Sequence, residues 1–200
     1  MKRPASLALF FIGACAWFLV LSVGWIQVAR WTSYPAASVA QIILDSNALD
    51  WVASTQNVPG QLKVRTKFNK LLPGGGVATP IAVVEPAHCT YGIAVFLALL
   101  LAARCKRFVS RAIAGYVLLL IPQAFSLVFV VLGQIVREVP FQLLGISVWQ
   151  VDAIIVSNVF GTIILPTLAP VCLWLWMEEE FFVSLVRRMA SPPMLANPAH

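Results

Sequence analysis

Residues 6–29 read SLALFFIGACAWFLVLSVGWIQVA, and this uncharged stretch decides the class of the fold. About 20 consecutive apolar residues let a helix cross the roughly 30 Å hydrocarbon core of a bilayer, so the stretch predicts a transmembrane helix. Lys2 and Arg3 precede it, and basic residues that flank a span favour the cytoplasmic side. The apolar run is longer than that of a signal peptide and no small-residue cleavage site follows it, so we expect an uncleaved anchor.

The composition supports a membrane location for the whole chain. Of the 200 residues, 60% are hydrophobic and 11% are charged, whereas about 25% of the residues in a soluble domain are charged. The net charge of +6 comes largely from basic residues at the ends of apolar stretches, where they set orientation, so we expect membrane lipids and no nucleic acid as partners. The four cysteines lack metal-ligand spacing, and we expect no metal, no cofactor and no disulfide framework.

Three further apolar stretches predict spans at residues 87–103, 112–136 and 148–176. The tight loop after the first of them carries four basic residues, which mark it as cytoplasmic: Arg104, Lys106, Arg107 and Arg111. We therefore expect a mainly α-helical integral membrane protein with four transmembrane helices. It is expected in a bacterial inner (plasma) membrane, with both termini in the cytoplasm.

Residues 30–86 are predicted to lie outside the cytoplasm and to form a helix and a β-hairpin. Apolar residues at near-helical spacing predict an amphipathic helix over residues 35–54. In residues 62–68 (LKVRTKF), basic and mostly apolar residues alternate, which is typical of a half-buried strand. The breaker PGGG (residues 73–76) and the returning stretch VATPIAVV (residues 77–84) complete the hairpin, and Pro80 places the second strand at an edge because proline cannot donate to a ladder.

The chain thus divides into four parts. Residues 1–29 form the cytoplasmic N-terminus and the first transmembrane helix. Residues 30–86 form the outer helix and hairpin, and residues 87–176 hold the other three spans. Residues 177–200 form a cytoplasmic tail that begins with an amphipathic segment.

The hairpin and the spans supply the candidate site residues. Lys63, Arg65 and Lys67 fall on one face of the first strand. They are either a solvated face or a binding site for an anionic partner, whether lipid headgroups or a carboxylate-bearing protein segment.

A second set consists of polar residues in or beside the spans. Cys89 and Arg137 are expected on the outer face, and a thiol near a cation is a weak catalytic candidate, although the interpretation of Cys89 as a small interfacial residue is favoured. Asp152 is the carboxylate nearest a span interior; it pairs with Arg137 in one interpretation and lines a transport path in another. Asn158 and Gln123 are expected to form hydrogen bonds between helices.

The layout of the first half of the chain resembles a known family. An uncleaved first span leads to an outer helix and a hairpin with a Gly-rich turn. The junction Glu85-Pro86…Tyr91-Gly92 then enters a Leu- and Ala-rich span, IAVFLALLLAARC (residues 93–105). Over residues 15–135 this arrangement resembles the exosortase-associated small membrane proteins, in particular the exosortase H-associated type.

The resemblance implies a partner and a role. Such proteins accompany exosortases, multi-span transpeptidases that process C-terminal sorting signals with a cysteine, an arginine and a histidine in that order. Here Cys89 and Arg137 match the order, but no outward-facing histidine follows Arg137. The resemblance therefore implies an accessory protein rather than the transpeptidase itself.

Three functional hypotheses follow. The first is a non-enzymatic accessory subunit of an envelope protein-sorting or export system that docks a membrane-protein partner, an exosortase in the simplest case, through its outer segment. The second is a cysteine-dependent membrane peptidase or transpeptidase using Cys89 and Arg137. The third is a subunit of a transporter or other large membrane complex, with Asp152 lining a path.

Overall fold

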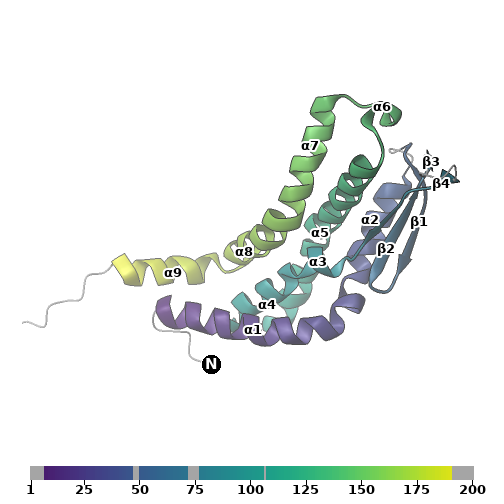
Figure 1. The fold of residues 1–200 in the computed structure, drawn as a ribbon. Helices are drawn as coiled ribbons and strands as arrows, with labels where there is room; N and C mark the ends of the chain where they lie inside the picture. Colours follow the sequence, from purple (N-terminus) through teal and green to yellow (C-terminus); the bar gives the residue numbers. More distant parts are fainter. Residues whose placement is uncertain (1–6, 47–49, 72–76, 106, 191–200) are drawn as a thin grey trace, which may run out of the picture.

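Three helices in the structure are long and apolar enough to cross a membrane (Figure 1). They are α1 (Leu7–Thr32), α5 (Phe108–Glu138) and a third made of α7 (Val148–Val159), the π-helical turn η1 (Phe160–Ile164) and α8 (Leu165–Met177). The computed structural model describes residues 7–46, 50–71, 77–105 and 107–190. The first, third and fourth predicted spans are therefore confirmed as long apolar helices of a membrane protein.

The predicted second span is shorter than the others. Residues 87–102 form α3 (Ala87–Thr90) and α4 (Gly92–Ala102). At 1.5 Å per residue this segment measures about 24 Å, less than the roughly 30 Å thickness of the hydrocarbon core. Length and composition thus support three of the four predicted spans. The fourth crossing and the side on which each terminus lies stay predictions.

Helix α4 is shielded by its neighbours. It packs mainly against α1 and α8, and also against α5. The side chains of Phe96 and Leu100 are completely buried, and Gly115 of α5 leaves room for the Phe96 ring, which a β-carbon at that position would meet at 2.1 Å. Burial on several sides explains why this helix is apolar over its whole circumference.

The outer helix ends earlier than the sequence predicted. α2 covers Tyr34–Asp45, and residues 52–54 belong to strand β1 (Val52–Val58). Pro59 and Gly60 connect β1 to β2 (Gln61–Thr66), with Val58 opposite Gln61. Gly60 has a φ of +90°, as glycine has after proline in a type II turn. The extension of the helix to residue 54 was wrong because the pairing of β1 with β2 outweighs the helical spacing of a few apolar residues.

The predicted hairpin is confirmed. β2 pairs antiparallel with β5 (Ile81–Val84), with Leu62 opposite Val84 and Val64 opposite Ala82. The strand order β1-β2-β5 places β5 at an edge, as Pro80 predicted. Between β2 and β5, the short strands β3 (Lys70–Leu71) and β4 (Val77–Ala78) pair with each other, and the predicted glycine turn lies outside the described residues.

Helix α2 lies between this sheet and α5 (Figure 1). Its buried face consists of Ala36, Ala37, Ala40 and Leu44, and the small alanines allow close approach on both sides. Together with side chains from the sheet and from α5 they form one continuous core. The sheet is therefore fixed to one end of the helical bundle.

The short helix α6 (Phe141–Leu144) joins α5 to α7 at this same end (Figure 1). At the other end the chain bends after α8 and forms α9 (Glu179–Ala190), the part of the predicted tail that the structure describes. Phe181 of α9 packs against Phe10 and Trp174 in a second core.

Candidate functional site

The exposed face of the sheet presents basic side chains in its central strand. Lys63 and Arg65 are exposed, whereas Leu62 and Val64 between them are completely buried. This alternation follows from the pleat, which sends successive side chains to opposite faces. Lys67, just beyond the end of β2, is exposed as well.

The surroundings of the two central cations are mixed in polarity. Lys63 lies opposite Gln56 on β1 and Val83 on β5, and Arg65 lies opposite Ser54 and Ile81. Ile81 and Val83 are 45% and 43% exposed. Within the described part of the chain, Lys63, Arg65 and Lys67 form no ion pair. The face therefore offers cations beside a small apolar edge.

Hydrogen bonds hold the opposite face of the sheet to α2. Asn57 Nδ2 donates to Ser38 Oγ at 2.9 Å, and Thr55 Oγ1 donates to the Asp45 carboxylate at 2.7 Å. Thr66 Oγ1 donates to the Pro80 carbonyl at 3.0 Å. These bonds hold β1 on α2 and the start of β5 beside β2, so the basic face is presented by a fixed scaffold and not by a loop.

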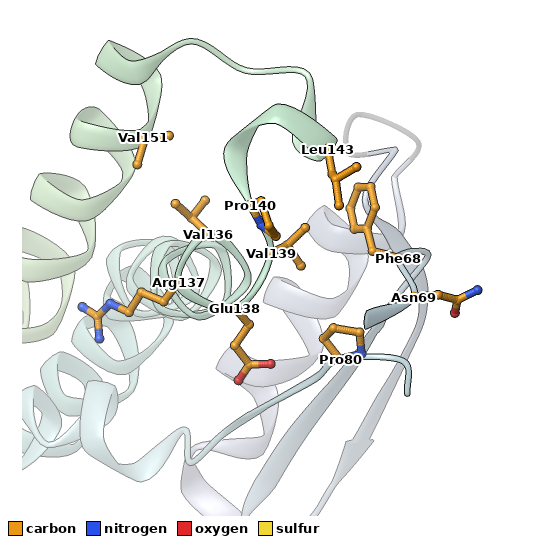
Figure 2. Close-up of a pocket in the computed structure, with 10 residues that line it drawn as sticks. All are labelled: Phe68, Asn69, Pro80, Val136, Arg137, Glu138, Val139, Pro140, Leu143 and Val151. Atoms are coloured by element: carbon orange, nitrogen blue, oxygen red, sulfur yellow. The ribbon is translucent and has the colours of Figure 1, made fainter. Parts of the chain in front are cut away.

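A groove of about 540 Å³ opens beside the sheet, between the hairpin, the end of α5, α6 and α7 (Figure 2). Its apolar wall includes Phe68, Val139 and Leu143, and its polar groups come from Asn69, Arg137 and Glu138. Figure 2 shows the Arg137 side chain extending away from Phe68 and Leu143. Trp51 Nε1 donates to the Leu144 carbonyl at 3.2 Å and so ties the base of β1 to α6.

The weak catalytic candidates do not form a catalytic arrangement. Cys89 is 1% exposed. Reactive cysteines lie instead in partly exposed, electropositive surroundings that favour the thiolate. His88 is exposed and lies 3.6 Å from Glu85, with which it pairs when protonated. The structure thus gives Cys89 no activating base in His88.

Arg137 is also remote from this thiol. Cys89 shares a small cavity with Gln123 and Ser126 of α5. Arg137 follows Ser126 by eleven residues, which is about 16 Å along an α-helix. Cys89 of α3 therefore lies beside the middle of α5, whereas Arg137 lies at the end of α5.

The intramembrane polar residues occupy three different environments. Asp152 is exposed on α7 and, among the described residues, has no ion pair with Arg137. Asn158 is 8% exposed and fills the space over Gly133 of α5, where a β-carbon would come within 2.5 Å of its Nδ2. Thr162 Oγ1 donates to the Asn158 carbonyl at 2.7 Å. Asn158 thus marks a close contact of α5 with α7.

Gln123 was predicted to form a hydrogen bond between helices. Its side chain is 3% exposed, yet within the described structure neither Nε2 nor Oε1 has a hydrogen-bond partner. A buried polar group without a partner costs about 1–3 kcal/mol.

An ion pair that the sequence did not predict joins the ends of two long helices. Arg111 of α5 pairs with Glu178, whose side chain is 3% exposed, at the junction of α8 and α9. The available signal was a pair of opposite charges at the ends of two spans that were both predicted to end on the cytoplasmic side. No rule of spacing identifies such a pair, because the residues lie far apart in the sequence.

Comparison with known proteins identifies the family. No match was found among curated proteins or among solved structures. Residues 4–181 match the family described as exosortase H-associated membrane protein, and the matched stretch includes the outer sheet and all three long helices. The chain therefore belongs to the exosortase H-associated membrane proteins.

Proposed function

We propose that this protein is a non-enzymatic accessory subunit of an envelope protein-sorting or export system in the bacterial inner membrane. Its outer sheet binds a membrane-protein partner, an exosortase in the simplest case, and the long helices anchor and orient the sheet. The family name supports an association with exosortase. The observation that carries the proposal is the pair of exposed cations Lys63 and Arg65 at the centre of a fixed sheet, neither of which has an ion-pair partner among the described residues.

The chemistry of the face defines the partner segment. The partner segment carries carboxylates that reach Lys63 and Arg65, and apolar side chains that cover Ile81 and Val83. Bidentate pairing with a carboxylate favours arginine over lysine as the stronger contact. The apolar groove that Phe68 lines is a separate surface on the bundle side of the hairpin, and it receives another, apolar part of the same partner.

Because Lys63 and Arg65 are exposed, their charges contribute little to the stability of the fold. Exposed ion pairs contribute about 0–1 kcal/mol to stability, and these cations have no described partner within the chain. Changing their charge therefore leaves the fold intact. A change in association then reports on binding directly.

The test reverses two charges and measures co-purification with the partner. We expect Lys63→Glu/Arg65→Glu to lose at least about 90% of co-purified exosortase, since each 1.4 kcal/mol of lost binding lowers affinity tenfold. The control Lys63→Arg/Arg65→Lys keeps the charge at the same positions and retains the partner. Deleting residues 62–84 is less informative, because it removes the central strand and uncovers α2.

Wild-type co-purification by the reversed variant would contradict the proposal. The remaining alternative is that the face binds anionic lipid headgroups. Reconstitution of both proteins in purely zwitterionic nanodiscs distinguishes it from binding to a protein partner. If the reversal has no effect there and acts only with anionic lipids, the face binds headgroups and the proposal of a protein partner fails.

A further inference from the structure

The two edges of the three-stranded sheet differ in how well they are protected. β5 forms one edge; it is four residues long, follows Pro80 and contacts α5. Gln134 Nε2 of α5 donates to the Val83 carbonyl at 3.2 Å. A short strand, a proline and a covering element are devices by which proteins keep an edge strand from pairing further. The β5 edge is therefore closed to another strand.

β1 forms the other edge and lacks these devices. It is seven residues long, VASTQNV, and contains neither a proline nor a charged residue. After Val52 none of its residues is buried. It lies on the side of the sheet away from α5 (Figure 1), and within the described part of the chain no strand pairs with its outer side. An edge strand of this kind is open to pairing.

The register of the hairpin shows which backbone groups of β1 point away from β2. Val58 and Gln61 flank a two-residue turn, so they form a hydrogen-bonded pair, and every second residue along the strand does the same. The N–H and C=O groups of Thr55 and Asn57 therefore point outward. The Thr55 carbonyl accepts from Gln41 Nε2 at 3.4 Å. Among the described residues, the two outward N–H groups and the Asn57 carbonyl have no partner.

The charges on the exposed face indicate which kind of strand fits this edge. Arg65 and Lys63 lie opposite Ser54 and Gln56 of β1. A strand added to β1 lies about 10 Å from β2, twice the spacing of neighbouring strands, and two long side chains of opposite charge span that distance together. Antiparallel pairing with the β1 of a second copy would instead place two sets of cations on one face, where like charges repel.

We propose that the outer edge of β1 binds an extended segment of the partner protein as a fourth strand, with carboxylates on alternate residues directed toward Lys63 and Arg65. Main-chain hydrogen bonds to Thr55 and Asn57 supply affinity and the alternate side chains supply specificity, as in other cases of strand addition. This inference rests on the proposed docking of a partner at the sheet and specifies how the contact is made. The carboxylates approach the cations from the side of β1.

Hydrogen exchange at single backbone amides tests the pairing. The full-length protein in nanodiscs is compared alone and in complex with exosortase, and electron-transfer fragmentation resolves the exchange of each residue. We expect the amides of Thr55 and Asn57 to exchange at least about tenfold more slowly in the complex, since each gains a hydrogen-bond acceptor. The amide of Gln56 already belongs to the ladder with β2 and is the internal control, whose exchange should change less.

Two variants at one position test whether the outward amide is needed for binding. Thr55→Pro removes the outward N–H without removing a donor from the ladder to β2, whereas Thr55→Val keeps that N–H. Both variants lose the hydroxyl that donates to Asp45, so this loss cancels in the comparison. We expect Thr55→Pro to lower the amount of co-purified exosortase at least about tenfold and Thr55→Val to retain it.

The outcomes distinguish strand pairing from docking in general. Unprotected amides at Thr55 and Asn57 in a complex that Lys63→Glu/Arg65→Glu disrupts, or wild-type co-purification by Thr55→Pro, overturns strand pairing and leaves the docking proposal standing. Failure to form any complex overturns both. Protection of the two amides in the protein alone, increasing with its concentration, identifies a second copy as the occupant and also overturns the inference. If Thr55→Pro does not fold, the exchange measurement on the wild-type complex decides.

Discussion

Glu178 is a buried carboxylate at the junction of α8 and α9, and its partner Arg111 is one-third exposed. Leaving Glu178 without its partner therefore costs more stability than leaving Arg111 without its partner. An isolated buried charge is strongly unfavourable, whereas a partly exposed guanidinium can turn toward water. The pair fixes the start of α5 to the end of α8.

We predict an asymmetric loss of stability at this pair. Arg111→Met strands the buried carboxylate and should destabilise the fold by about 3–5 kcal/mol, the usual effect of breaking a buried pair. Glu178→Gln leaves Arg111 access to water and should cost clearly less. Thermal unfolding in detergent measures both, and equal losses would show that Glu178 is not buried as described.

Single residues also limit what could be predicted from the sequence. The alternation of Lys63 and Arg65 with Leu62 and Val64 is a local pattern, so their exposure followed from the sequence. The burial of Cys89 and the isolation of Gln123 depend on how α3, α5 and α8 meet, and no local pattern encodes those contacts. Cys89 and Arg137 were both expected on the outer face, and for the same reason their separation along α5 was not predictable.

At the scale of elements, glycines set how closely α4 can approach α8. A β-carbon on Gly92 would lie 2.4 Å from the Pro166 carbonyl oxygen and 3.3 Å from Pro170 Cγ. The first of these atoms belongs to backbone and cannot rotate away. Gly24 of α1, by contrast, has no heavy atom within 4 Å of the same position.

The two glycines provide a matched pair of substitutions. We predict that Gly92→Ala destabilises the protein by about 1–3 kcal/mol, as overpacking of a close contact does. Gly24→Ala should be neutral or slightly stabilising, because alanine favours the helix. Midpoints of thermal unfolding compare them, and a neutral Gly92→Ala would contradict the described contact of α4 with α8.

Some helices and strands could be predicted from the sequence and others could not. The long apolar helices and the β2–β5 hairpin were predicted because length and period-two alternation are local signals. Strand β1 was missed because Val52 fits a helical pattern as well as a strand. The turn at Pro59 and Gly60 was the available signal, since proline followed by glycine favours a type II turn between two strands.

At the scale of the whole molecule, the length of α3 and α4 determines the topology. If this short apolar segment crosses the membrane, Arg107 and Lys67 lie on opposite sides. If it enters and returns, they lie on the same side and the two termini on opposite sides. The four basic residues around α4 and α5 favour a crossing.

Cysteine accessibility distinguishes the two topologies. In a variant without native cysteines, Lys67→Cys and Arg107→Cys are labelled separately with a membrane-impermeant maleimide in intact cells and after permeabilisation. We expect Lys67→Cys to react in intact cells and Arg107→Cys to react only after permeabilisation. Reaction of both in intact cells would show that α3 and α4 do not cross.

The central claim is that the outer sheet of this exosortase H-associated protein contacts a membrane-protein partner, and in-cell photocrosslinking tests it most directly. A photoreactive amino acid replaces Gln56, which lies opposite Lys63 on the exposed face, and in a second variant replaces exposed Trp176 at the far end of α8. We predict a covalent adduct with exosortase from position 56 and none from position 176. Adducts from position 176 alone, or from neither position while the two proteins still co-purify, would contradict the account.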